Sequence, residues 1–359
     1  MFGYIILIGV PLIWHIICML MNVKKKNIRN ISVILFFTIL ILLLGLRDIS
    51  VGTDTKNYIY YYELIGRAPF DKIFVVTETL SSSMEHGFVL LMRLFYMAKA
   101  PFNLFLLFCA FVSLFPLMIL CYKQSDNPLL VILLFACVSP FTMYFSGIRQ
   151  AMTMGIGVVA FYFSSKKKLF WFYLTIALSF FIHKTAIALI VLYPLLHLKI
   201  LKKHLVFVFA LSLIILLFGE TILKMLLPLL GNYGKYRIMS TGAYRMILLL
   251  FIFVVFCFFI PEEKTASTMF YCLRNVLCLC LVLQCFSRHS FVATRVMYFF
   301  GIFVPLAIDK SIACSRKQYK SFSDLASISM IAFFFIYFFA DTFFGNDGLN
   351  IFPYVPFWG

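Results

Sequence analysis

The chain has 359 residues, of which 63% are hydrophobic and 13% charged, and its formal net charge is +17. Soluble domains are nearer half apolar and a quarter charged, so this composition excludes an ordinary soluble protein and indicates a polytopic membrane protein. The positive charge comes from short lysine tracts between apolar runs, not from the interleaved basic and aromatic surface that nucleic-acid binding needs. We therefore expect no nucleic-acid partner.

The first apolar run, FGYIILIGVPLIWHIICMLM, has no positive residues before it and is followed by KKK. That order argues against a cleaved signal peptide and predicts a retained membrane helix whose N-terminus lies outside. The ten cysteines lie mostly inside such apolar runs and form no paired CxxC motif. They are typical of small buried hydrophobic residues, not of a disulfide framework.

Apolar segments recur along the whole chain, and a membrane-spanning helix needs roughly 20 such residues. The sequence predicts an all-α polytopic bundle of about 12 (10–14) transmembrane helices, forming a single membrane domain over residues 1–359. Several segments are short, which predicts tilted or re-entrant pieces. The candidate segments are 2–21, 31–46, 102–122, 128–147, 150–165, 169–182, 185–198, 205–228, 244–260, 266–287, 296–309 and 322–343.

The loops between these segments alternate in character. One set is rich in lysine and arginine, with Glu262 and Glu263 as its few acids, and is predicted to be cytoplasmic. The other set is longer or more mixed, and is predicted to be external together with both termini. The basic residues of the first set are Lys24, Lys25, Lys26, Arg29, Lys123, Lys166, Lys167, Lys168, Lys199, Lys202, Lys203, Lys264, Lys310, Arg316, Lys317 and Lys320. The second set is 47–86, the corner at Arg149, 229–245, 288–295 and the C-terminal tail.

The run 169–198 tests this topology, because lysines flank both of its ends. One continuous crossing would place one lysine cluster outside. Two short segments that meet at His183 and Lys184 keep both clusters inside, and we favour this broken pair. It places His183 and Lys184 on the external side.

The longest loop, 47–86, exceeds a simple connector. The stretch that ends it, EHGFVLLMRLFYMAKA, has apolar residues at helical spacing together with Arg93 and Lys99. It predicts an amphipathic helix along the outer interface. We expect residues 47–101 to form a large extracytoplasmic loop that contains this helix.

Ionisable side chains gather on the predicted external side, mostly within a turn of a helix end. The basic ones could bind a phosphate, and Asp54, Glu85 and His183 could move a proton. These residues are Arg47, Asp48, Asp54, Glu85, Arg149, His183, Lys184, Arg245, Arg288, His289 and Arg295.

Two arginines are the main candidates for binding a diphosphate. Arg149, in FSGIRQAM, occupies a tight corner between two apolar runs, where an arginine either extends to the headgroups or binds a diphosphate with its two-pronged guanidinium. Arg295 stands near the start of a helix, beside Arg288 and His289 and without a nearby acid. A helix start adds free N–H groups that favour an anion.

Other candidates have equally plain structural explanations. A histidine such as His183 inside an apolar run is often a hydrogen-bonded structural group, yet ionisable residues in membrane segments are costly and frequently functional. Asp54, in VGTDT, suits either a base or an ordinary turn or helix cap, and Glu85 is a comparable candidate. Arg274, in the middle of a span, either pairs with a buried polar group or contacts substrate.

Several chemistries have no sequence signature here. The chain lacks GxxxxGK[ST], HExxH, GxSxG and Asp-rich DxD or DDxxD motifs. We expect no metal and no cofactor.

Taken in order, the polar motifs resemble those of the EpsG family of bacterial membrane proteins, which overlaps the Wzy-type O-antigen and capsule polymerases. The resemblance spans nearly the whole chain, and single motifs carry less weight than their order. Departures from the family pattern are HKT in place of HxS-type triplets, which leaves the role of Lys184 open, and an extra arginine in RHSFVATR. The motifs are LRDISVGTDTKNYIYYY, EHGFVLLMRLF, FSGIRQAM, FIHKTAIALI, TRVMYFFGIFVPL and FPYVPF.

The resemblance implies an integral membrane glycosyltransferase that works without a metal at the outer face of the bacterial plasma membrane. Such proteins join repeat units carried on undecaprenyl diphosphate, with the growing chain as donor and a second lipid-linked unit as acceptor. A chain-length regulator protein is the expected protein partner. By this reading Asp54, His183 and Glu85 are the catalytic candidates. The candidates for binding substrate or its diphosphate are Arg47, Arg149, Arg295, Arg288, Lys184, Tyr298 and Arg274.

Two other functions stay open at this point. An O-antigen ligase would use the same donor with a different acceptor, although ligases tend to carry one large external loop late in the chain, and here the longest loop is early. A lipid-linked oligosaccharide flippase or other transporter would place charges along a path through the membrane and would show an internal repeat. Only Arg274 favours such a path.

Overall fold

The computed structural model describes residues 2–78, 84–138, 140–226, 243–259, 267–316, 318–344 and 349–358. These residues form helices joined by loops, without a β-strand. The predicted loop 229–245 lies mostly outside the described residues, as do Glu262, Glu263, Lys264 and Lys317. The helices group into two compact units, residues 1–190 with 333–359, and residues 191–332.

The first unit contains the helices from α1 to η2 and the end of α18. They are α1 (Phe2–Leu20), α2 (Lys26–Arg29), α3 (Ile31–Gly45), α4 (Thr55–Arg67), η1 (Phe70–Lys72), α5 (Ile73–Glu78), α6 (His86–Met97), α7 (Phe102–Gln124), α8 (Pro128–Cys137), α9 (Met143–Ser146), α10 (Ile148–Ser165), α11 (Leu169–Ile182) and η2 (Lys184–Val191). The second unit contains α12 (Leu192–His197), η3 (Lys202–His204), α13 (Leu205–Leu226), α14 (Tyr244–Phe259), α15 (Thr268–Ser287), α16 (Phe291–Gly301), α17 (Val304–Arg316) and the first half of α18 (Lys320–Phe344).

Fewer helices than predicted are long enough to span a membrane alone. Among the described residues, six pass by length and composition, or seven if the bent pair α16 and α17 forms one span. The all-α fold is therefore confirmed, whereas the count of about 12 is not. The predicted segments do fold as helices, but α8, α11 and α14 have 10, 14 and 16 residues, too short for a hydrocarbon core of about 30 Å at 1.5 Å per residue.

Two predicted segments are interrupted. The segment 128–147 forms a helix only to Cys137, and α9 follows it. The segment 296–309 falls on the end of α16 and the start of α17, which are bent by 43° to one another. The run 169–198, predicted as two segments, breaks at His183, whose backbone is extended (φ −156°, ψ 118°). The expected break at His183 and Lys184 is thus confirmed, while the side of the membrane on which it lies stays a prediction.

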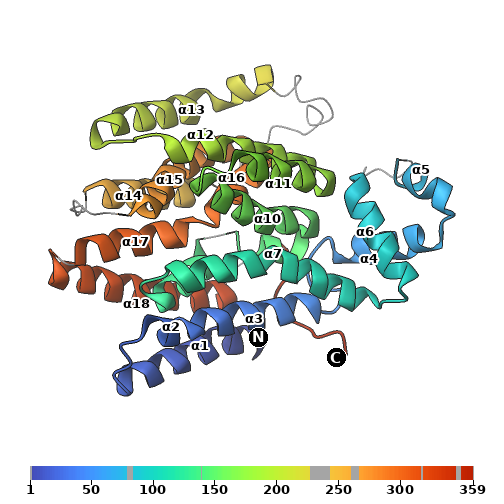
Figure 1. Ribbon diagram of the computed structural model, residues 1–359, viewed down its shortest axis with the longest axis horizontal. Coiled ribbons are helices and arrows are strands. Elements are labelled where there is room, and N and C mark those ends of the chain that lie inside the picture. The colour runs from blue at the N-terminus through green and yellow to red at the C-terminus, as the bar shows by residue number, and fades with distance from the viewer. Residues whose placement is uncertain are drawn as a thin grey trace. The chain divides into compact units, whose positions relative to one another are not determined.

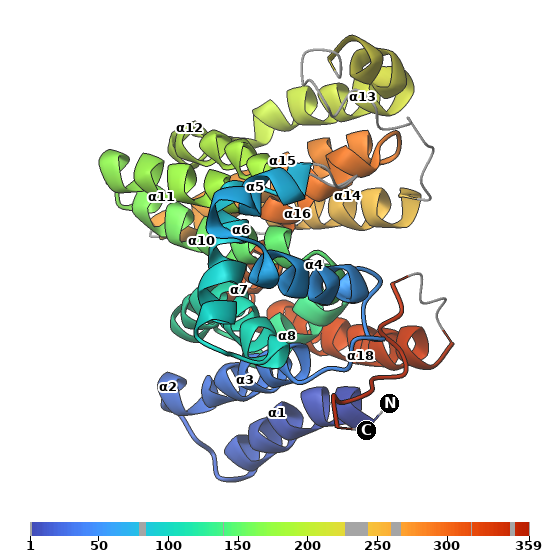
Figure 2. The same cartoon turned by 90° about the vertical axis from the view of Figure 1, so that its right-hand side faces the viewer.

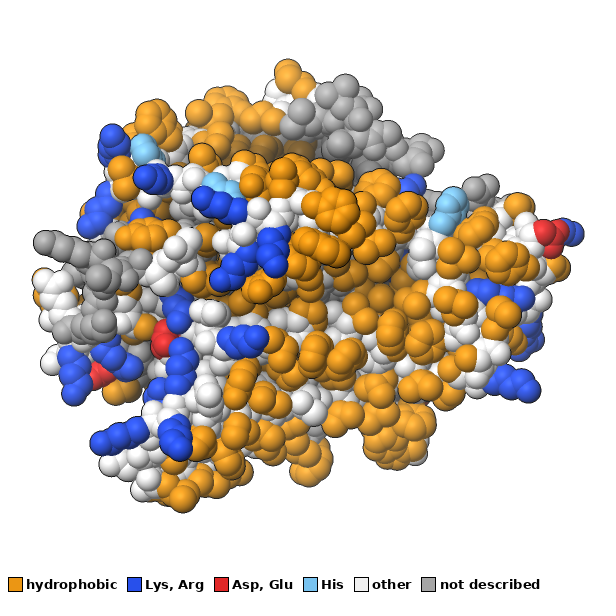
Figure 3. Space-filling view, viewed as in Figure 1, with side chains coloured by type: hydrophobic (Ala, Val, Ile, Leu, Met, Phe, Trp, Pro, Cys, Tyr) orange, Lys and Arg blue, Asp and Glu red, His pale blue; other side chains and the backbone are white. Residues whose placement is uncertain are grey.

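In the first unit, α1, α3, α7, α10 and α11 lie one beside the next, and α4, α5 and α6 form a smaller cluster near the start of α7 (Figures 1 and 2). Hydrophobic side chains cover the surface of α1, α3 and α7 in the space-filling view, and lysine and arginine side chains gather near α2 and around α4–α6 (Figure 3). Such an apolar middle is what a membrane-embedded helix bundle requires.

Polar contacts fix the two ends of this bundle. At one end the Lys26 ammonium binds Asp126 at 2.6 Å, and Asn30 donates to the backbone oxygens of Tyr122 and Ser125. At the other end Asn103 donates to the backbone oxygens of Gly45 and Arg47. Helices α3 and α7 are therefore antiparallel, and the lysine-rich loop at Lys24–Arg29 lies at the end of the bundle opposite Arg47.

The long loop 47–86 contains regular structure that its sequence pattern did not predict. It holds α4, η1 and α5, and α4 buries Tyr58, Tyr62 and Ile65. The expected helix over 85–100 is present as α6 and buries Phe88, Val89 and Met92. Arg93 of α6 donates to the backbone oxygens of Ile65 and Gly66, the last turn of α4, where a cation is favoured by the helix dipole.

The GTD turn is held by the C-terminal segment 349–358. Gly52 has φ +89° and its amide donates to the Asn350 oxygen, while the Thr53 amide donates to the Leu349 oxygen. Further on, Asp48 and Val355 share a backbone hydrogen bond, and Arg47 bridges Pro356. The stretch LRDISVGTD therefore packs against the C-terminal segment, its start against FPYVPF and its end against Leu349 and Asn350.

We predict that Gly52→Ala destabilises the protein, whereas Gly9→Ala does not. At Gly52 a Cβ would lie 2.1 Å from the Phe145 oxygen and would also meet an unfavourable positive φ, which typically costs about 1–3 kcal/mol. At Gly9, inside α1, a Cβ meets nothing within 4 Å. The measurement is the unfolding midpoint of each purified variant in detergent, and equal midpoints would show that the turn adapts at no cost.

Candidate functional site

The carboxylate of Glu85 is the centre of a buried polar cluster in the first unit. Its Oε2 accepts a hydrogen bond from Arg149 Nη1 at 2.5 Å. Its Oε1 lies 3.0 Å from His183 Nδ1 and 3.1 Å from the amide of Lys184, which donates to it. The side chains of Glu85 and His183 are 7% and 9% exposed and that of Arg149 is 18% exposed, so the cluster is largely shielded from solvent.

Three separate irregularities of the helical fold bring these groups together. Glu85 precedes the first residue of α6 with an extended backbone, His183 occupies the break after α11, and Arg149 lies in the first turn of α10. Gly87 allows the approach of α6, because a Cβ there would lie 2.6 Å from the Phe181 oxygen at the end of α11. A polar cluster forms where helix ends meet, since backbone groups are free to join it only there.

The electrostatic balance keeps Glu85 ionised. Burial by itself raises the pKa of a carboxyl group, but here the hydrogen bond with His183, the charge of Arg149 and the Lys184 amide outweigh it and lower the pKa of Glu85 to about 2. Both carboxylate oxygens of Glu85 also already take part in hydrogen bonds. Glu85 was predicted as a possible proton acceptor, and this geometry suits it better to orienting a neighbour.

That neighbour is His183. If its Nδ1 carries the proton that binds Glu85, the other ring nitrogen, Nε2, keeps its lone pair and can accept a proton. A carboxylate that fixes the tautomer of an imidazole in this way is the arrangement of many histidine bases. The cluster therefore provides a base at Nε2 and a reason for its orientation.

Arg149 retains donor capacity beyond its bond to Glu85. Its Nε is buried without a hydrogen-bond partner. Tyr58 of α4 also hydrogen-bonds the guanidinium. Tyr58 was not singled out from the sequence, although it belongs to the GTDTKNYIYYY motif, whose aromatic run was the available signal.

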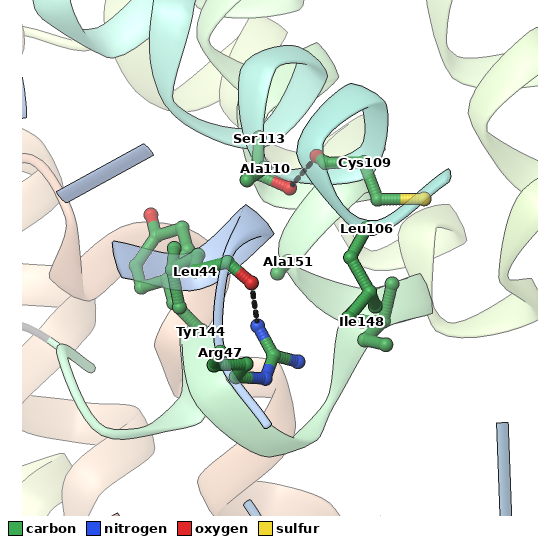
Figure 4. Close-up of a pocket in the computed structure, with 9 residues that line it drawn as sticks. All are labelled: Leu44, Arg47, Leu106, Cys109, Ala110, Ser113, Tyr144, Ile148 and Ala151. Carbon is green, nitrogen blue, oxygen red and sulfur yellow. Dashed lines mark hydrogen bonds between the residues drawn. The ribbon is translucent and has the colours of Figure 1, made fainter. Parts of the chain in front are cut away.

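Arg47, predicted as a candidate phosphate contact, is buried in the structure. It is 2% exposed, and its Nη1 donates to the Leu44 oxygen at 2.5 Å. Its guanidinium borders a cavity between the end of α3, α7 and the first turn of α10, where it lies near Leu44 and Ile148 (Figure 4). This burial does not favour direct contact with a diphosphate.

The remaining candidates of the first unit lie near the surface. Asp54 is half-buried at the N-cap position of α4, and its side chain makes no capping hydrogen bond. Its backbone oxygen accepts from the Tyr58 amide, so the residue starts the helix as the turn explanation expects. The side chain of Lys184 is exposed. For both, a role in catalysis or binding stays a prediction.

The candidates of the second unit are described separately. Ser290 caps α16 by accepting from the Val292 amide, so Arg295 stands one turn inside that helix and its side chain is exposed. The guanidinium of Arg288 lies 4.7 Å from the ring centre of Tyr244. Tyr298, also in α16, is half-buried. The expected binding roles of these three residues stay predictions.

Arg274 is 3% exposed within α15 and has protein contacts that account for its burial. Its Nη2 donates to the Ile200 oxygen at 3.2 Å, and its guanidinium lies 4.1 Å from the ring centre of Phe258. Phe270 and Tyr271 supply further rings within 5.2 Å. Pairing with aromatic faces stabilises a desolvated arginine. This favours the structural explanation over a substrate contact.

Among the described residues, no group of three or more His, Cys, Asp or Glu side chains could hold a metal ion. The polar groups that meet in the Glu85 cluster are a histidine, a carboxylate and an arginine, each at a helix end.

Several long apolar helices, with polar clusters at their ends, are characteristic of a multi-pass membrane protein. The model of the EpsG family matches residues 30–355 of the chain, a range that includes all three residues of the Glu85 cluster. The chain belongs to the EpsG family. No match was found among curated proteins or among solved structures.

We predict that the ionised form of Glu85 makes the stability of the protein depend on acid pH. Its pKa is about 2 in the folded protein and 4.5 in the unfolded chain, so its contribution is complete above pH 4.5 and is lost as the pH falls towards 2. The contribution is roughly 3 kcal/mol at neutral pH. The measurement is the unfolding midpoint of wild type and Glu85→Gln between pH 7 and pH 3.

Glu85→Gln should be less stable than wild type at neutral pH and should lose less of its stability on acidification. Glu63→Gln is the matched control, because Glu63 pairs with Arg67 at the exposed surface of α4 and that variant should follow the wild-type curve. Parallel curves for wild type and Glu85→Gln would contradict the prediction.

Proposed function

We propose that this protein is a polysaccharide polymerase that joins undecaprenyl-diphosphate-linked oligosaccharide repeat units by glycosyl transfer at the outer face of the bacterial plasma membrane. Membership in the EpsG family supports a role in polysaccharide synthesis. The single observation that carries the reaction type is the oriented His183 beside Glu85 and Arg149.

The reaction needs a base for the acceptor hydroxyl and positive charge for the leaving diphosphate. As the hydroxyl oxygen attacks the anomeric carbon of the donor, its proton passes to Nε2 of His183. The bond between that carbon and the diphosphate oxygen breaks, and undecaprenyl diphosphate leaves with the electron pair. The proton on His183 then returns to solvent or to the departing diphosphate.

The proposed roles within the cluster differ from residue to residue. His183 is the base. Glu85 positions it and compensates the charge on the imidazolium as it forms. Arg149 holds Glu85 with one nitrogen, and its side chain, which is 18% exposed, is the proposed donor to a diphosphate oxygen. Asp54 remains the alternative base.

Further positive charge must come from other basic residues. Arg295, Arg288, Tyr298 and Lys184 keep the roles in binding substrate or its diphosphate that the sequence predicts for them, each as a separate proposal. Arg47 and Arg274 are not assigned to this contact, because both are buried and already bound to protein groups.

The decisive experiment follows lipid-linked glycan in a strain that lacks the gene. We expect single repeat units, transferred to the final carrier or left on the lipid, and no long chains, because polymerisation alone is lost. Complementation with the wild-type gene should restore the chain-length distribution. A flippase would instead leave repeat units trapped on the cytoplasmic side, and a ligase would leave long chains on undecaprenyl diphosphate. Long chains on their normal carrier in the deletion strain would end the proposal.

The role of His183 is tested by complementation with His183→Asn, which should give at least a hundredfold less polymer because general-base catalysis contributes about 10²–10⁴-fold. His197→Asn is the matched control, because the His197 side chain is exposed in α12. Among the described aromatic contacts, its ring packs only against that of Tyr193. Protein levels in the membrane must be equal. Wild-type polymer length with His183→Asn would transfer the role of base to another residue.

A further inference from the structure

Helix α4 has two faces of different character. The face that packs against α6 buries Tyr58 and Tyr62, four residues apart as in any packed helix. The opposite face carries the exposed side chains of Asn57 and Tyr60, and Asp54 is half-buried where the helix starts. The buried face accounts for the packing of α4, so the polar and aromatic groups of the other face need a separate explanation.

Two polar side chains at the start of α4 have no partner within the described residues. The Asp54 carboxylate neither caps the helix nor pairs with a cation there, and the Asn57 amide makes no hydrogen bond to those residues. The two residues are three positions apart, so they lie on one side of the helix within a single turn. Together they offer a carboxylate that accepts hydrogen bonds and an amide that both donates and accepts them.

An aromatic pair adjoins these polar groups. Tyr60 is 57% exposed, and its ring centre lies 5.6 Å from that of Tyr61, which is half-buried. Tyr61 follows Asn57 by four residues and Asp54 by seven, the spacing at which side chains line up along one helix face. We call Asp54, Asn57, Tyr60 and Tyr61 the α4 strip. At 1.5 Å per residue it is about 10 Å long.

Aromatic rings beside planar polar groups suit a carbohydrate. A sugar ring has an apolar face of C–H groups, which packs against the negative face of an aromatic ring, and a rim of hydroxyl groups. A carboxylate or an amide can hydrogen-bond two neighbouring hydroxyls at once. A diphosphate would not suit the α4 strip, because the unpaired carboxylate of Asp54 would repel it.

The α4 strip adjoins the Glu85 cluster through Tyr58. This residue directly follows Asn57 in the chain and hydrogen-bonds Arg149, which in turn binds Glu85. All of these residues belong to the first unit. A glycan that rests on the strip would therefore lie next to the cluster that contains His183, the proposed base.

We propose that the α4 strip binds a sugar ring of the acceptor repeat unit and selects it by the arrangement of its hydroxyl groups. This assignment rests on the proposed function, because it names the place where that reaction holds its acceptor. Asn57 is the specificity-determining residue, since an amide that loses its hydroxyl partner in a complex is costly. The tyrosines contribute affinity with less selectivity, because most sugar rings have an apolar face.

The test measures the binding of a free oligosaccharide to the purified protein in detergent by saturation-transfer NMR titration. The probe is the repeat-unit oligosaccharide released from the strain's own surface polysaccharide by partial acid hydrolysis. We expect saturable binding to the wild type. Tyr60→Ala and Asn57→Ala should each weaken it by roughly 3–10-fold, through the loss of one stacked ring or of one set of hydrogen bonds. Tyr60→Phe keeps the ring and should bind as the wild type does.

Matched controls come from exposed residues of the same types in the first unit. Tyr173→Ala removes a tyrosine that is 47% exposed and whose ring likewise pairs with its neighbour, Phe172. Asn27→Ala removes an exposed asparagine of α2. Both controls should bind the glycan as the wild type does. Equal affinity of the wild type, Tyr60→Ala and Asn57→Ala would overturn the proposal and assign the tyrosines to the aromatic belt of the membrane interface. Absence of saturable binding to the wild type would overturn it as well.

Selection is tested with an unrelated oligosaccharide, maltotetraose. The wild type should prefer the strain's own glycan, and Asn57→Ala should reduce that preference. An unchanged preference in Asn57→Ala would contradict the role of this residue in specificity.

Failure of the α4 strip and failure of the proposed function are distinguishable. Long chains in the deletion strain would end the polymerase assignment, yet weaker glycan binding by Tyr60→Ala would still support a carbohydrate on the strip. Loss of long chains in the deletion strain, together with unaltered binding by both α4 variants, would support the polymerase and overturn the strip.

Discussion

The need to solvate one buried carboxylate organises the first unit around Glu85. Burial alone makes an ionised carboxylate unfavourable by several kcal/mol, and the protein replaces the lost water with three donors from two helix ends. Arg149 comes from the start of α10, His183 from the break after α11, and the Lys184 amide from the residue that follows. Since each donor lies at a helix end, the positions of α6, α10 and α11 depend on the same pair of oxygen atoms.

This dependence explains why the helix ends are irregular where they are. A regular helix through His183 would use the Lys184 amide in its own hydrogen bonds and could not offer it to Glu85. Gly87 serves the same purpose on the other side, because any side chain there would separate α6 from the end of α11. The break, the glycine and the carboxylate are one structural solution, and the motifs EHGF and FIHKT of the sequence are its two halves.

The sequence predicted the helical class, the break at His183 and the grouping of polar residues at helix ends, because hydropathy and lysine tracts report directly on burial and on chain direction. It did not predict α4 or the partners of Arg47. Helix α4 is amphipathic and rich in tyrosine, a pattern that a loop also accommodates. The pairings of Glu85 with Arg149 and with His183 join residues 64 and 98 positions apart, and the packing of α6 and α10 against α11 decides them. The count of about 12 membrane spans is not confirmed for a related reason, since hydropathy marks apolar segments but not whether each continues for a full crossing.

The ionised state of Glu85 also decides how the cluster divides its work. A carboxylate whose pKa is about 2 is a weak base, so proton transfer falls to the imidazole that it orients. The same negative charge holds Arg149 in place, so only the N–H groups of Arg149 that do not bind Glu85 can contact a substrate. A glycosyl transfer that releases a diphosphate needs more positive charge than one partly occupied guanidinium supplies. The proposal therefore requires a further cation, and Lys184, whose exposed side chain follows His183 directly in the chain, is the nearest one in the sequence.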